Sequence, residues 1–313
     1  MRQPPPRILF AASNAGAQAD SLERMAALAR TLHAELHVLR VLADLHNYTP
    51  WTPSDHLIDD GASLDRFTVA CRETRAWSQE LLQRDLTDEC WQVRIGAFVP
   101  EVAEHARALN ALLIVLAPEH ARMGALVTEL VSASALPVLL ARGRTTGTAI
   151  IAATDLRDRR YPVLDRASVV AERLAAHLVV VHNAGTNGLP ARLASLLRAL
   201  KSPERDFDDS CTQRLADAVS HLPEDAEAIV AGEIDPVEAI LRHARSRDAD
   251  IIVVGAHSRS SLRRLVASSV AARVVDRARR SVLVTPLDGL STGSRTPRRP
   301  QPGDPSPSRY THG

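Results

Sequence analysis

Short apolar runs alternate with longer amphipathic stretches along most of the chain. The runs are apolar at successive positions rather than at every second one, as in Leu112–Leu116 and Ile251–Val254. Such runs are typical of strands in a parallel sheet that helices cover on both faces. The stretches between them have helical spacing. Because strands that alternate with helices are joined by right-handed crossovers, the pattern predicts an α/β fold with a doubly wound parallel sheet.

The pattern predicts five strands in each half of the chain. They are expected at residues 7–12, 35–42, 91–96, 111–117, 137–141, 149–154, 177–182, 227–231, 250–255 and 281–285. The clearest helices between them are expected at residues 64–82, 99–109, 164–175 and 236–246.

The second half of the sequence repeats the first at a nearly constant offset. Leu22-Glu23-Arg24 and Leu164-Asp165-Arg166 occupy similar helices 142 residues apart (164 minus 22), and each helix leads into an apolar strand. The apolar blocks of the other strands match in the same order. Chance similarity between helices rich in Ala, Leu and Arg could produce one such match. Several matches in register indicate a duplicated unit.

The repeat sets the expected domain boundaries. Residues 1–142 are predicted to form the first domain and residues 148–289 the second, with a linker rich in Gly and Thr between them. Residues 290–313 are rich in Pro, Ser and Arg and are predicted to be a disordered tail.

Composition narrows the function classes. The 313 residues are 45% hydrophobic and 24% charged, which suits two packed domains. A formal net charge of +1 gives no electrostatic case for a nucleic-acid or membrane partner. The three cysteines are scattered and no metal-ligand spacing is present. With neither a signal-peptide core nor a run of about 18 apolar residues, a cytoplasmic location is expected.

The turn after strand 250–255 carries the best candidate chemistry. Ligands of doubly wound sheets bind beyond the carboxyl ends of the strands. Here Gly255 begins a segment of small and basic residues, and Ser268-Ser269-Val270 begin a helix. Small residues allow close backbone approach, and a helix start offers free N–H groups to a phosphate. Asp155, at the end of strand 149–154, could accept hydrogen bonds from a base or ribose. Helix capping alone would also explain these serines.

This segment resembles the universal stress protein family. The family pattern Gly-x2-Gly-x9-Gly-Ser/Thr corresponds to Gly255-x2-Ser258-x9-Ser268-Ser269, and the spacing is the same. The resemblance implies two tandem domains with a Rossmann-like, adenine nucleotide alpha hydrolase-like fold. It also implies an ATP site in the second domain. The cofactor-binding residues carried over are Asp155, Asn183, Gly255, Ser258, Ser268, Ser269 and Val270.

The sequence departs from the family pattern in both halves. Two of the three motif glycines are Ser258 and Ser268. A serine is strained if the backbone there needs a positive φ, whereas its hydroxyl can help to hold phosphate if it does not. In the first half Ala117-Pro118-Glu119 follows the equivalent strand, and Asn14 replaces the aspartate. Pro118 has no N–H and Glu119 repels phosphate, so the first domain is expected to bind no nucleotide.

These features favour a stress-response binding protein rather than an enzyme. The second domain is expected to bind ATP or a related nucleotide, and the final strands of the two domains are expected to pair as an intramolecular pseudo-dimer, with a homodimer also possible. The alternative is a nucleotide-free scaffold for dimerisation or interaction. A slow ATPase ranks last, because Lys201 is the only lysine and no general base is evident, so no catalytic residue is expected.

Overall fold

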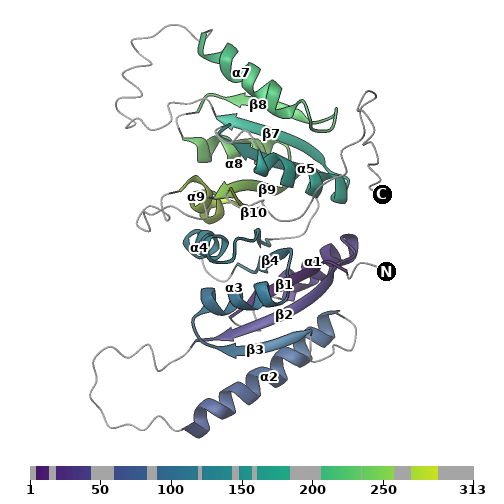
Figure 1. Ribbon diagram of the computed structural model, residues 1–313, viewed down its shortest axis with the longest axis vertical. Coiled ribbons are helices and arrows are strands. Elements are labelled where there is room, and N and C mark those ends of the chain that lie inside the picture. Colours follow the sequence, from purple (N-terminus) through teal and green to yellow (C-terminus); the bar gives the residue numbers. More distant parts are fainter. Residues whose placement is uncertain are drawn as a thin grey trace, which may run out of the picture.

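The structure is a computed structural model, shown in Figure 1. It describes ten stretches of the chain. These are residues 5–13, 19–43, 60–82, 90–118, 122–142, 148–156, 161–183, 206–233, 235–256 and 269–287.

The described residues form strands and helices that alternate in both halves. The strands are β1 (Arg7–Ala12), β2 (Glu35–Leu42), β3 (Trp91–Ile95), β4 (Leu113–Leu116), β5 (Val138–Leu140), β6 (Ala149–Thr154), β7 (His177–Asn183), β8 (Glu227–Ala231), β9 (Ala249–Ala256) and β10 (Ser281–Pro286). The helices are α1 (Ala19–Thr31), α2 (Asp60–Leu82), α3 (Phe98–Ala108), α4 (Gly124–Ser134), α5 (Pro162–Leu174), α7 (Asp206–Val219), α8 (Pro236–Ser246) and α9 (Val270–Arg277).

All ten strands join one sheet in the order β3-β2-β1-β4-β5-β10-β9-β6-β7-β8. The five strands of each half are parallel to one another and have the same internal order. The halves meet where β10 pairs antiparallel with β5, with Leu283 opposite Leu139. Because that one pairing reverses direction, the carboxyl ends of the first five strands and of the last five lie at opposite edges of the sheet.

Helices cover both faces of the sheet, as the sequence predicts (Figure 1). One buried cluster joins the strands to α3, α4, α8 and α9, and the other joins them to α1, α5 and α7. Both clusters run through the two halves without a break. All six residues of β10 are buried, which explains why its sequence is not an alternation of apolar and polar residues. The doubly wound α/β fold is confirmed.

Local sequence explains where two of the second-half helices begin. Asp235 precedes α8 and its side chain accepts a hydrogen bond from the backbone N–H of Val237 at 3.1 Å, while Pro236 occupies the first helical position. Ser269 caps α9 in the same way through the N–H of Ala272, also at 3.1 Å. Short polar caps of this kind satisfy N–H groups that the helix itself leaves unpaired.

The two halves also pack through α4 and α9, which lie side by side at the middle of Figure 1. A Cβ on Gly124 would lie 2.2 Å from the carbonyl oxygen of Ala272, so only glycine permits this approach of the two backbones. The N–H of Gly124 donates to the Asp276 carboxylate at 2.7 Å. The carboxylate of one half therefore caps a helix of the other.

Arg142 binds the carboxyl end of α9. Its guanidinium donates to the carbonyl oxygens of Val275 and Ala278 at 2.6 and 2.7 Å, where the helix leaves carbonyl groups unpaired. Its backbone N–H donates to the Ser281 hydroxyl at 2.8 Å. Burial lowers the pKa of Arg142, and the nearby Asp276 carboxylate opposes that shift. Arg142, which the sequence pattern places at the boundary between the first domain and the linker, is thus a structural contact between the halves.

Two features are absent from the described residues. No described helix is both long and apolar enough to cross a membrane. Within the same residues, no group of three or more His, Cys, Asp or Glu side chains is placed to hold a metal ion.

Candidate functional site

A cavity of about 170 Å³ lies at the carboxyl ends of β6, β7 and β9. β6 and β9 are neighbours in the sheet although they are not consecutive in the chain, so the cavity lies at the topological switch point of the second half. It is lined by Ala153, Thr154, Asp155, Tyr161, Pro162, Val163, Val181, Asn183, Pro236, Ile240, Val254, Gly255, Val270, Ala271 and Leu287. None of these lining residues carries a positive charge, and most are apolar.

The end of β6 supplies the acidic group. Asp155 follows the last residue of the strand, and its side chain is exposed. Beside it, the Thr154 hydroxyl accepts a hydrogen bond from the N–H of Leu156 at 3.1 Å, and the Thr154 carbonyl lies 2.9 Å from Nδ1 of His182 on β7. These contacts connect the ends of the two strands beneath the cavity and leave the carboxylate at its rim.

Gly255, near the end of β9, lies where a side chain would not fit. A Cβ there would lie 2.5 Å from Cδ2 of Leu287 and 2.9 Å from Cγ2 of Val163. Leu287 is held by its own N–H, which donates to the Ala256 carbonyl at 2.9 Å. A side chain at this position would therefore require Leu287 or Val163, which form part of the cavity wall, to shift.

The first turn of α9 faces the cavity. Val270 and Ala271 line it, while the Ser269 hydroxyl binds the N–H of Ala272. The amino end of a helix carries a partial positive charge and free N–H groups, so it favours an anionic group. The same element that contacts the first half therefore begins at the cavity.

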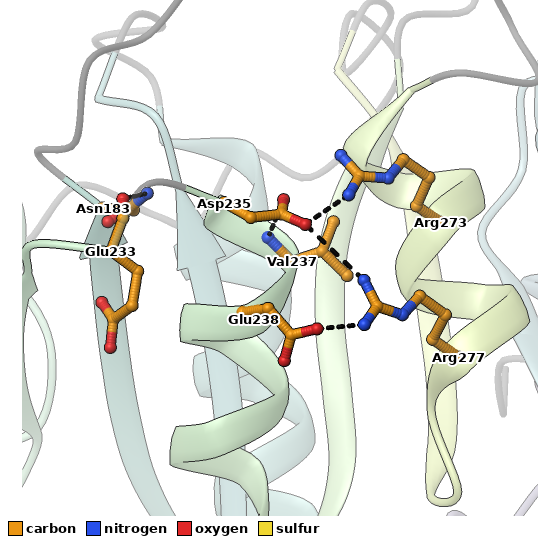
Figure 2. A network of polar contacts seen from close by, with 7 residues as sticks. All are labelled: Asn183, Glu233, Asp235, Val237, Glu238, Arg273 and Arg277. Atoms are coloured by element: carbon orange, nitrogen blue, oxygen red, sulfur yellow. Dashed lines mark hydrogen bonds and ion pairs between the residues drawn. The ribbon is translucent and has the colours of Figure 1, made fainter. Parts of the chain in front are cut away.

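Asn183, the last residue of β7, is buried on the opposite side of the cavity from α9. Only 8% of its surface is exposed, and its Nδ2 donates to the backbone carbonyl of Glu233 at 3.1 Å. Figure 2 shows this contact beside an ion-pair network in which Asp235 binds Arg273 and Arg277, and Glu238 binds Arg277. The network connects the start of α8 to α9, so it positions two elements that line the cavity.

The structure brings together four of the seven residues that the family pattern indicated, namely Asp155, Asn183, Gly255 and Val270. Ser269 adjoins them as the α9 cap. Ser258 and Ser268 lie outside the described residues. Tyr161 and Leu287 also line the cavity, and no sequence pattern indicated either of them. The Tyr161 ring stacks on His221 of the α7–β8 connection at a centroid distance of 6.0 Å, a contact no local pattern predicts.

The first half has a different cavity at the corresponding place. About 160 Å³ in volume, it is lined by Ala11, Ser13, Phe98, Leu116, Ala117, Met123 and Leu126. β1 ends at Ala12 as β6 ends at Thr154, 142 residues later, so Ser13 corresponds to Asp155. The pairing of Asn14 with Asp155 was therefore wrong by one residue. Without a carboxylate in its lining, this cavity is almost wholly apolar.

The fold and this cavity define a class of α/β domain that binds ligands at the carboxyl edge of its sheet. The sequence profile of the universal stress protein family matches residues 148–286. The second half of the chain therefore belongs to the universal stress protein family. No curated protein sequence matches the chain.

Solved structures extend the likeness of fold to both halves. A universal stress protein from Archaeoglobus fulgidus is 13% identical, with 90% of this chain and 96% of that chain covered at a TM-score of 0.58. A protein of unknown function from Pseudomonas aeruginosa PAO1 is 19% identical, with 90% and 92% covered and a TM-score of 0.53. At these identities the likeness concerns the fold alone.

Proposed function

We propose that the second half binds ATP or a related nucleotide, and that the protein acts in a cytoplasmic stress response through contacts with other proteins. The observation that supports this most is the cavity at the switch point of a universal stress protein domain. There, Asp155, Asn183 and the start of α9 lie around one space. Binding, rather than turnover, is the proposed activity.

The cavity has two chemically different parts, and each of them suits one part of a nucleotide. The apolar walls and the Asp155 carboxylate suit a base and a ribose, which offer a flat apolar face and hydroxyl or amino donors. The start of α9 suits a phosphate. The volume is smaller than the range of about 300–1,000 Å³ usual for small-molecule pockets. We therefore assign the described cavity to the nucleoside, with the phosphates towards the start of α9.

The domain organisation is part of the same proposal. Residues 1–142 and 148–289 would be two copies of one domain that pair internally through β5 and β10, and the first copy would support the second without binding nucleotide. The apolar lining of the first cavity favours that division of roles. An interaction scaffold without nucleotide is the second candidate, and the replacement of two motif glycines by Ser258 and Ser268 favours it.

Filling each cavity in turn tests the proposal. Ala153 lines the cavity of the second half, and Ala11, 142 residues earlier, lines that of the first. Calorimetric titration with ATP is expected to give saturable binding for the wild type and for Ala11→Leu. Ala153→Leu is expected to weaken binding at least tenfold, because the added side chain occupies the space of the nucleoside.

Native mass spectrometry of the purified protein complements the titration, since a tightly held nucleotide would survive purification. If the folded wild-type protein neither carries nor takes up nucleotide, the scaffold is the correct function. If Ala11→Leu weakens binding as much as Ala153→Leu does, the site has been assigned to the wrong half.

A further inference from the structure

The Asn183 side chain has a hydrogen-bonding requirement that the described part of the chain does not meet. Its Oδ1 is buried and has no hydrogen-bond partner among the described residues. Asn183 also lines the cavity. A buried acceptor without a donor costs free energy, so native proteins normally supply a partner for it from the chain, from water or from a ligand.

The orientation of this amide is set by its other end. Nδ2 donates to the backbone carbonyl of Glu233 at 3.1 Å. A carbonyl oxygen can only accept, so rotating the amide by half a turn would place two oxygens against each other. Asn183 is therefore held with its nitrogen towards Glu233 and its oxygen available as an acceptor.

The fold does not require a polar residue at this position. β2 and β7 are equivalent strands, and Val41 in the first half corresponds to Asn183 (183 minus 142). Val41 is 2% exposed and belongs to the buried apolar core. An apolar side chain thus occupies the same strand position in the half whose cavity is apolar. The sheet therefore does not need the polar group of Asn183, and this favours a role for that group in ligand binding.

The charged group in the lining of the cavity is an acceptor as well. Asp155 contributes a carboxylate to the cavity, and the lining includes no Lys, Arg or His side chain among the described residues. The Thr154 carbonyl is already paired with His182. A ligand edge that pairs with the Asn183 oxygen or with this carboxylate must therefore bring its own donors, such as N–H groups.

From these contacts we infer that Asn183 is a specificity-determining residue, which selects a nucleobase whose edge donates an N–H hydrogen bond. The inference rests on the proposed nucleotide function and adds the chemistry of base selection to it. A site built to pair a ligand N–H discriminates strongly against an analogue that lacks it, because the buried acceptor is then left unpaired.

The test compares two nucleotides on three proteins. ATP carries an amino group on the edge of its base, whereas purine riboside 5′-triphosphate has the same ring system and no N–H donor on that edge. Dissociation constants for both are measured by calorimetry with the wild type, with Asn183→Leu and with Val41→Leu. Asn183→Leu removes the acceptor at similar volume, and Val41→Leu is the matched change in the other half. Thermal unfolding confirms that each variant is folded.

The wild type and Val41→Leu are expected to prefer ATP by about tenfold or more, and Asn183→Leu to bind the two nucleotides within about twofold of each other. Equal binding of both nucleotides by the wild type, or an undiminished preference in Asn183→Leu, would overturn the role of Asn183 while leaving nucleotide binding intact. If the wild type binds neither nucleotide, the proposed function itself fails, and the inference fails with it.

Discussion

At the scale of single residues, the cavity wall depends on the absence of a side chain at Gly255. Its missing Cβ leaves room for Leu287 and Val163, which would otherwise lie 2.5 and 2.9 Å away. A side chain at this position would require at least one of these two neighbours to shift. The residue that the family pattern connects with nucleotide therefore also has a packing role in this chain.

Gly255→Ala is expected to lower the free energy of unfolding by about 1–3 kcal/mol, because the added methyl group overpacks the wall. Gly232→Ala is the matched control, since a Cβ on Gly232 meets no atom within 4 Å. Urea unfolding of both variants measures the difference. Equal stability of the two would mean that Leu287 moves aside freely.

A second residue-scale prediction concerns the buried His105 of α3. Burial lowers its pKa from the ordinary 6.5, and the charges of Arg94 and His37 lower it further, while Glu104 opposes them. A depressed pKa means that the folded state binds the proton less well than the unfolded state does. The stabilisation is therefore complete above about pH 6.5 and is lost as the pH falls below that value.

Urea midpoints at pH 7.5 and 5.5 measure this effect. His105→Gln is expected to lose less stability between the two pH values than the wild type does. His177→Gln is the control for the loss of a histidine, because the His177 side chain is 43% exposed. A wild-type pH dependence in His105→Gln would show that another group is responsible.

At the scale of elements, α9 has contacts of three kinds. Its start lines the cavity, its middle packs on α4 through Ala272 and Gly124, and its end is bound by Arg142. Eight residues thus connect the candidate site to the other half of the chain. A ligand that favours one position of α9 would also favour one arrangement of the junction between the halves.

Arg142→Met is expected to destabilise the protein by about 1.5–3 kcal/mol, because the carbonyls of Val275 and Ala278 lose a charged donor. Arg280→Met removes an ion pair with the exposed Asp248 and should cost no more than about 1 kcal/mol. Chemical unfolding compares the two, and an equal cost would show that the Arg142 contacts add nothing to stability.

Most elements could be predicted because their signal is local. β1, β2, β6, β8 and α8 have the boundaries that the apolar runs and helical spacing indicate, and the other predicted elements differ only at their ends. The positions of Asp155, Asn183 and Gly255 at strand ends followed from the same pattern. Tyr161, Leu287 and Arg142 could not be found in this way, because each acts through a contact with a residue distant in sequence.

At the scale of the whole molecule, the junction pairs the last strand of each half. β5 and β10 would each be an edge strand if the halves were separate, with a row of unpaired backbone N–H and carbonyl groups. Joining them in one chain makes their pairing independent of protein concentration.

Residues 1–142 and residues 148–289, produced as separate chains, are therefore expected to associate with each other or with themselves. Light scattering after size-exclusion chromatography measures this, with the full chain of 34.0 kDa as the reference. Two monomeric pieces that remain apart when mixed would show that the β5–β10 pairing does not hold the halves together.

The reversal of strand direction at the β5–β10 junction also decides where the chain enters and leaves the sheet. β1 begins and β10 ends at the same edge, and this is the edge that carries the cavity of the second half. The cavity of the first half opens at the far edge. If the protein were attached to a surface through the chain just before β1 or just after β10, the candidate nucleotide site would therefore face that surface. A group joined directly after Leu287 would begin at the mouth of the site.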